Sequence, residues 1–96
     1  MFVLVTYDVS TTDKEGRRRL RKIARECLDW GQRVQFSVFE MDVSKAQWIQ
    51  VRSRLLGIAD LQQDSIRFYF IDATARANVE HHGIKRPPDL GGPLVV

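Results

Sequence analysis

The segment Arg33-Val-Gln-Phe-Ser-Val-Phe-Glu-Met-Asp-Val43 decides how this chain folds, because its apolar residues alternate twice with a change of phase between them. Two sets of opposite parity follow one another: Val34, Phe36 and Val38, then Phe39, Met41 and Val43. A single flat strand cannot change phase, since a shift by one residue moves every side chain to the other face. The segment therefore predicts two short antiparallel strands, or one strand broken by a bulge around Ser37.

A helix is predicted on the N-terminal side of this segment. Thr12 and Glu15 have the spacing of a capping box, in which each side chain bonds the free backbone N–H of the other residue. Apolar residues then recur at helical spacing and form one stripe, which comprises Leu20, Ile23, Ala24, Cys27 and Leu28. We expect the helix to run to about Trp30 and to be closed by Gly31 in a left-handed conformation.

A second helix is predicted on the C-terminal side. Ser44 and Gln47 form another capping box. The apolar residues that follow at helical spacing should face inward, and these are Trp48, Val51, Leu55 and Ile58. The helix should end before Asp60.

Two further strands complete the pattern, at residues 2–9 and 66–71, where apolar, β-branched and aromatic residues form near-continuous runs. The order β-α-β-β-α-β predicts an α+β, ferredoxin-like domain over residues 1–72, with both helices on one face of a four-stranded antiparallel sheet. Residues 73–96 are predicted to be a tail of the same domain, with a short strand at 79–84. Its apolar end, Pro93–Val96, should pair with the sheet edge of a partner subunit.

Length and composition agree with one intracellular domain. Ordinary domains have roughly 100–150 residues, and this chain has 96, of which 44% are hydrophobic. Its single cysteine, Cys27, excludes an internal disulfide and suits a reducing compartment. No apolar run approaches the ~20 residues of a membrane span, and the short apolar N-terminus lacks the basic leader of a signal peptide. We therefore expect a soluble, cytoplasmic protein without a membrane partner.

Positive charge is concentrated at the start of the first predicted helix. The chain carries a net charge of +3, but residues 14–25 alone hold seven basic residues and one acid. This clustering is typical of a protein that binds a polyanion, although a solvated helix face would have the same composition. Four arginines of the cluster could bind phosphates: Arg17, Arg18, Arg19 and Arg21.

Asp8 is the candidate metal ligand. It ends an otherwise apolar strand and lies just before the basic helix, whose N-terminus favours anions. Mg²⁺ is commonly held by one or two carboxylates while it keeps several waters. One acid per chain makes a thin site, which a symmetric dimer with two copies of Asp8 would complete. By position alone, a lone aspartate at such a site is more often a turn or cap residue than a metal ligand.

Phe39 and Ser37 are the candidates in the strand pair. An aromatic side chain exposed on a sheet can stack on bases, but Phe39 could equally belong to the core or to a dimer interface. Ser37 has no neighbouring His and Asp with which to form a nucleophile system.

Together these motifs resemble a known family, the small CRISPR-associated adaptation proteins, the second core protein of those systems (Cas-two). The resemblance rests on Leu4-Val-Thr-Tyr-Asp8-Val, on the Arg17–Arg21 cluster, and above all on Gly31-Gln-Arg-Val-Gln-Phe-Ser-Val-Phe-Glu40. It covers essentially the whole chain. The tail, from Val79-Glu-His-His-Gly83 to Pro93-Leu-Val-Val, resembles the subtype I-C branch.

The resemblance implies a ferredoxin-like homodimer with packed sheets and exchanged C-terminal strands. It implies that Asp8 and its copy hold Mg²⁺, and that the dimer is a metal-dependent endonuclease on double-stranded DNA or on RNA. It also implies a heterohexamer-like assembly in which the dimer bridges subunits of the CRISPR integrase. Arg17, Arg19, Arg33, Ser37 and Phe39 match positions that matter in the family's nuclease members.

Two functions therefore compete. In the first, the Asp8 pair and the arginines form a Mg²⁺-dependent phosphodiesterase. In the second, the basic surface is a non-catalytic, DNA-binding scaffold of the integrase complex. A plain RNA-binding module outside CRISPR systems is a weaker third interpretation.

Overall fold

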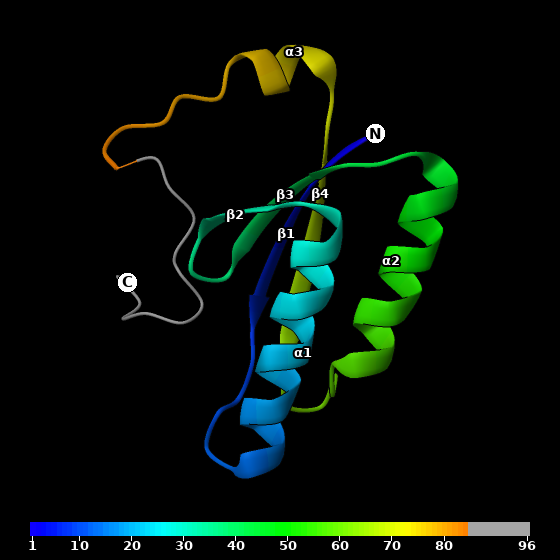
Figure 1. Ribbon diagram of the computed structural model, residues 1–96, viewed down its shortest axis with the longest axis vertical. Helices are drawn as coiled ribbons and strands as arrows, with labels where there is room; N and C mark the ends of the chain where they lie inside the picture. The colour runs from blue at the N-terminus through cyan, green and yellow to red at the C-terminus, as the bar shows by residue number, and fades with distance from the viewer. Residues whose placement is uncertain (85–96) are drawn as a thin grey trace.

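The computed structural model describes residues 1–84 and confirms the predicted order β-α-β-β-α-β, followed by one short helix (Figure 1). The elements are β1 (Phe2–Asp8), α1 (Lys14–Trp30), β2 (Gln32–Gln35), β3 (Val38–Asp42), α2 (Lys45–Ile58), β4 (Ser65–Ile71) and α3 (Ala73–Ala77). The four strands form one antiparallel sheet in the order β2-β3-β1-β4. The first strand of the chain therefore occupies the centre of the sheet.

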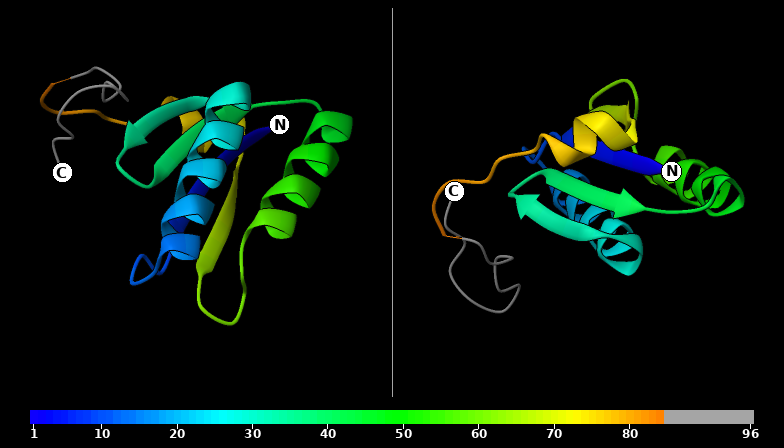
Figure 2. Two further views of the ribbon diagram at one scale, coloured as in Figure 1. Left: turned by 60° about the horizontal axis from the view of Figure 1, so that its bottom comes forward. Right: turned by 90° about the horizontal axis from the view of Figure 1, so that it is seen from above.

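Helices α1 and α2 lie side by side on one face of the sheet (Figures 1 and 2). Between these layers the sheet contributes Val3 and Val5 from β1 and Phe39 and Met41 from β3, all of them 1% exposed or less. The helices contribute the other fully buried side chains, which are Ile23, Cys27, Val51 and Leu55. Burial of each large apolar side chain contributes about 1.5–3 kcal/mol, so this shared core holds the helices against the sheet.

Both helix termini of α1 differ from expectation. The N-cap is Asp13, whose carboxylate accepts a hydrogen bond from the Gly16 N–H at 2.7 Å, and the predicted Thr12 cap is wrong. Gly31 is extended, with φ −154°, and not left-handed as predicted. A side chain at Gly31 would overlap the carbonyl oxygen of Glu40, so the glycine allows close approach to β3.

The other predicted local signals are confirmed. Ser44 and Gln47 form a capping box with both reciprocal hydrogen bonds at the start of α2. Of the two alternatives for the 33–43 segment, the structure shows two antiparallel strands, β2 and β3, joined by a tight turn at Phe36 and Ser37. The register irregularity lies within β2, between Arg33 and Gln35, and not at Ser37.

The predicted tail is described only in part. Residues 79–84 form no strand in the structure, so that prediction is wrong for this part of the chain. Pro93–Val96 lies outside the described residues. Within residues 1–84, none of the helices combines the length and the apolar character needed to cross a bilayer.

Candidate nucleic-acid and metal site

Asp8 is the last residue of β1 and its side chain is exposed. It alternates with the buried Val3, Val5 and Tyr7, and therefore lies on the sheet face opposite α1 and α2. Its ladder partner is Ser65, the first residue of β4. The carboxylate is thus presented to solvent from a rigid, central strand at the point where that strand ends.

The backbone on either side of Asp8 is held by residues from distant parts of the chain. One residue before it, the Tyr7 N–H donates to the Ser37 carbonyl oxygen at 3.2 Å. Two residues after it, the Ser10 N–H donates to Asp64 Oδ1 at 3.1 Å. Ser37 therefore contributes its backbone to the neighbourhood of Asp8.

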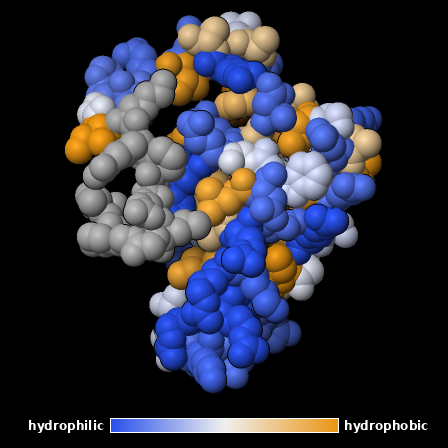
Figure 3. All heavy atoms as spheres, in the orientation of Figure 1, coloured by the Kyte–Doolittle hydropathy of each residue, from blue (hydrophilic) through white to orange (hydrophobic). Residues whose placement is uncertain are grey.

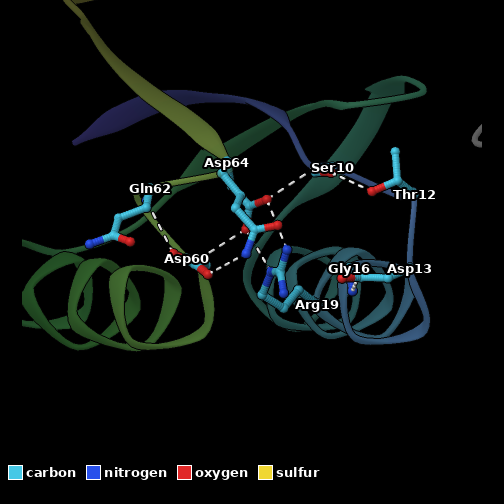
Figure 4. A network of polar contacts seen from close by, with 9 residues as sticks. Ser10, Thr12, Asp13, Gly16, Arg19, Asp60, Gln62 and Asp64 are labelled. Atoms are coloured by element: carbon cyan, nitrogen blue, oxygen red, sulfur yellow. Dashed lines mark hydrogen bonds and ion pairs between the residues drawn. The ribbon is translucent and has the colours of Figure 1, made fainter.

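Asp64 accepts hydrogen bonds from three separate segments (Figure 4). Besides the Ser10 N–H, its carboxylate accepts the Asp60 N–H at 2.9 Å and two N–H groups of Arg19, from Nε at 2.8 Å and from Nη2 at 3.3 Å. The Asp64 side chain is 0% exposed. Burial would raise its pKa, but the hydrogen bonds from Arg19 and from the Asp60 and Ser10 N–H groups hold the pKa below its ordinary value.

The arginine cluster divides into two kinds. Arg17, Arg18 and Arg21 are exposed on the first turns of α1, and Arg17 Nη1 donates to the Thr11 carbonyl oxygen at 3.3 Å. Arg19 is only 15% exposed at its side chain and is bound to Asp64. Hydrophilic side chains gather at the end of the molecule where α1 begins (Figure 3). This end has the charge needed to bind a phosphate backbone.

Arg33 and Phe39 lie inside the protein, on the helix-facing side of the sheet. Phe39 is 0% exposed, stacks on Tyr7 with ring centroids 6.1 Å apart, and lies 4.9 Å from the Arg33 guanidinium carbon. Of the alternatives left open for Phe39, the structure shows the core, and its ring has no surface to offer a base. Arg33 is also buried, and its Nε has no hydrogen-bond partner within residues 1–84.

Tyr7 joins this buried group to Asp8. Burial, together with the neighbouring Cys27, raises the pKa of Tyr7 to about 12, although the Arg33 guanidinium opposes the shift. Tyr7 is therefore a neutral phenol at any physiological pH. The side chains of Tyr7, Arg33 and Phe39 pack together on the helix-facing side of the sheet, next to the end of β1.

A divalent cation fits this site only in part. Within residues 1–84, no three His, Cys, Asp or Glu side chains cluster closely enough to hold a metal ion. Asp8 nevertheless offers an exposed oxygen ligand on a fixed strand, and a hydrated Mg²⁺ needs only one or two carboxylates. The donor set fits Mg²⁺ if a second copy of Asp8 joins it.

Comparison with known proteins assigns the family. The family model described as CRISPR associated protein Cas2 matches residues 1–79. The chain belongs to the Cas2 family. A Cas2 relative from Chlorobaculum tepidum, named a CRISPR-associated endoribonuclease, is 55% identical over 96 residues and covers 100% of both chains. One from Halalkalibacterium halodurans, named a CRISPR-associated endonuclease, is 43% identical over 95 residues, which cover 99% of both chains.

A solved Cas2 structure has the same fold. The crystal structure of Streptococcus pyogenes Cas2 at pH 6.5 matches with a TM-score of 0.77 and 49% identity, over 86% of this chain and 100% of that chain. Family membership agrees with the resemblance found in the Gly31–Glu40 motif.

Sequence reasoning missed Asp64 and Tyr7 as parts of this site. Tyr7 stands beside Asp8 in the motif, yet its burial depends on the sheet being covered by helices. Asp64 is 54 residues from Ser10 and 45 from Arg19. Asp64 is a single acid just before an apolar strand, and nothing in its local sequence indicates that it bonds Ser10 or Arg19.

Proposed function

We propose that this Cas2-family protein is a homodimeric, Mg²⁺-dependent endonuclease of CRISPR adaptation that cleaves phosphodiester bonds in double-stranded DNA or in RNA. The observation that carries the proposal is the exposed carboxylate of Asp8, held at the end of a central strand that leads through residues 9–13 into the arginine-rich start of α1. The names of the relatives, endoribonuclease and endonuclease, support the same activity.

In this proposal, Asp8 from each of two copies would hold the cation. Mg²⁺, when bound, supplies Lewis acidity and lowers the pKa of a bound water. Arg17, Arg18 and Arg21 bind the phosphates on either side of the scissile bond and offset their charge. Tyr7, Arg33 and Phe39 keep the end of β1 in place.

The exposed sheet face supports the homodimer. Asp8 lies on the face opposite α1 and α2, where α3 reaches only the far end of β1, with Arg76 over the Phe2 ring at 4.4 Å. Partly or fully exposed apolar side chains share that face with Asp8, and they include Leu4, Val38, Tyr69 and Ile71. A second copy on this face would cover them and bring two Asp8 carboxylates together.

Cleavage by wild type and by Asp8→Asn tests the proposal. Labelled single-stranded RNA and duplex DNA are incubated with each protein, with and without Mg²⁺. Asp8→Asn should cut at least about 100-fold more slowly, because it loses the charged ligand. Asp29→Asn, which alters an exposed carboxylate at the other end of α1, is the matched control and should cut like wild type. Unchanged cleavage by Asp8→Asn would show that the metal assignment is wrong.

The second candidate function is a DNA-binding scaffold of the CRISPR integrase, which the dimer would bridge in a heterohexamer-like assembly. The shortage of a second acid within the described chain favours it. The tail sequence supports subtype I-C, so the integrase to use is one from an I-C locus. Scaffolding would be the biological role if spacer integration persists in Asp8→Asn although that variant no longer cleaves. The same conclusion would follow if integration persists and wild type itself does not cleave.

A further inference from the structure

The β1–α1 loop begins where the pairing of β1 with β4 stops. The last paired residues are Asp8 and Ser65. Beyond them, the Ser10 N–H reaches Asp64, the residue just before Ser65. This one hydrogen bond extends the contact between the two strands by a further step beyond Asp8.

The same loop is fixed from its other side by α1. The Ser10 carbonyl oxygen packs so closely on Gly16 that a Cβ there would overlap it. Ser10 is therefore held through its N–H by Asp64 and through its carbonyl by the first turn of α1. The position of this residue sets the path of the chain as it leaves Asp8.

We propose that Asp64 is a positioning residue for Asp8, and that Arg19 serves the Asp64 carboxylate instead of binding nucleic acid. The catalytic part of this inference rests on the proposed nuclease function. The carboxylate is fully buried, and its two oxygens accept four hydrogen bonds from Ser10, Asp60 and Arg19. Arg19 directs two donors at it, whereas Arg17, Arg18 and Arg21 remain exposed.

Asparagine at position 64 would keep the shape of the side chain but could not accept all four hydrogen bonds. Its amide has one acceptor oxygen, so its NH₂ group would face N–H groups whose hydrogen bonds a carboxylate oxygen now accepts. The loop would lose part of the charge-assisted network through which Asp64 joins Arg19 of α1, Asp60 of the α2–β4 connection and Ser10. Asp60→Asn is the matched control, because the Asp60 carboxylate lies in the same connection but, among residues 1–84, bonds only Gln62 and Gln63.

The first experiment measures position and turnover in the dimeric protein. Asp64→Asn should accelerate hydrogen exchange of the Ser10 amide by about 10-fold, as expected for the loss of one hydrogen bond. It should lower kcat by about 10-fold or more, with KM for RNA unchanged, because misplacement acts on turnover and not on binding. Asp60→Asn should leave both quantities at the wild-type value. A lower melting temperature with unchanged Ser10 exchange and unchanged kcat would overturn the inference.

The second experiment asks what Arg19 does. Each arginine that contacts a phosphate contributes about 1 to the slope of log Kd against log salt. Arg18→Ala should reduce that slope by about 1, whereas Arg19→Ala should leave it unchanged and should lower kcat as Asp64→Asn does. Because the two residues act as one unit, the double variant should be no slower than either single variant. A reduced slope in Arg19→Ala would overturn the inference.

The two proposals can fail separately. If wild type does not cleave, the nuclease function fails, and the Ser10 exchange and the salt slopes still decide the role of Asp64 and Arg19. If Asp64→Asn does not fold, Arg19→Lys replaces it, since lysine keeps the charge but cannot direct two fixed donors at the carboxylate. Normal kcat and normal Ser10 exchange in Arg19→Lys would count against the inference.

Discussion

Replacing Gly16 by alanine tests how closely the loop after Asp8 packs on α1. Gly16 is the third residue of α1 and is buried. An added Cβ would overlap the carbonyl oxygen of Ser10 and would lie 3.1 Å from Oδ1 of the N-cap Asp13. The Ser10 oxygen belongs to the main chain, so no side-chain rotation can relieve the overlap. The loop itself has to move.

Two opposing effects set the magnitude. Alanine is favoured over glycine in a helix by up to ~1 kcal/mol. Overpacking a tight contact costs about 1–3 kcal/mol, and a contact with main chain belongs at the upper end. We expect Gly16→Ala to lower the free energy of unfolding by about 2 kcal/mol net. Gly57 is the matched control, because it lies in α2 and a Cβ added there would have no neighbouring atom within 4 Å. Gly57→Ala should therefore stabilise the protein by about 0.5 kcal/mol.

Urea unfolding at one fixed protomer concentration measures both variants, since the proposed dimerisation would make stability depend on concentration. The two substitutions should shift the midpoint in opposite directions, Gly16→Ala downward by about 1 M or more, with similar m-values. Cleavage by Gly16→Ala should also fall under conditions where the protein remains folded. If Gly16→Ala proves as stable as wild type, the loop does not pack on α1 in this way, and the account of how Asp8 is positioned loses one of its two supports.

Four further predictions concern stability, each measured by urea unfolding. Phe39→Ala should cost about 4 kcal/mol, as for a buried ring, and a cost under about 1 kcal/mol would place the ring at the surface. Arg33→Met should stay within about 1 kcal/mol of wild type, because the buried guanidinium makes no ion pair within residues 1–84 and methionine fills similar space. Burial raises the pKa of Cys27 from 9.0 to about 12. Its contribution to the free energy of unfolding is therefore complete below about pH 9 and is lost as pH rises toward about 12. Cys27→Ala should accordingly lose less stability at alkaline pH than wild type does. The pKa of Asp64 is lowered, so its contribution is present above about pH 4 and is lost as pH falls further, and Asp64→Asn should lack that part of the acid loss.

The fold could be predicted because its signals are local. The phase change around Ser37 excludes one flat strand and favours a strand pair or a bulge, and the apolar stripes of α1 and α2 set which helix faces are buried. The N-terminus of α1 could not be predicted from local signals alone. Thr12 and Asp13 are both good N-cap residues, and which of them caps the helix depends on Gly16, which must face the loop. That requirement comes from tertiary packing, which the spacing of Thr12, Asp13 and Glu15 along the sequence does not reveal.

The site was predictable only at its surface. Asp8 could be placed because it ends a strand pattern, and the exposed arginines because they surround an apolar stripe. Parity indicates that Arg33 and Phe39 share a face, since they are ladder partners, but it does not say that helices cover that face. A positive charge in a strand suggests solvent, yet Arg33 is 5% exposed. Its burial follows from its neighbours and not from its own chemistry.

In the proposed function, the division among the arginines gives the basic N-terminal end of α1 two separate tasks. A helix that only bound nucleic acid would have no use for a buried carboxylate beside its arginines, because Asp64 repels phosphate. The Asp64–Arg19 pair is neutral as a unit, so it holds the loop without weakening the field of Arg17, Arg18 and Arg21. Asp8 faces solvent from the end of β1, on the sheet face opposite α1 and α2. If two copies meet through the exposed sheet face, their Asp8 carboxylates repel one another, and a divalent cation between them lowers that cost. Cation binding and dimerisation would then strengthen each other by the same free energy.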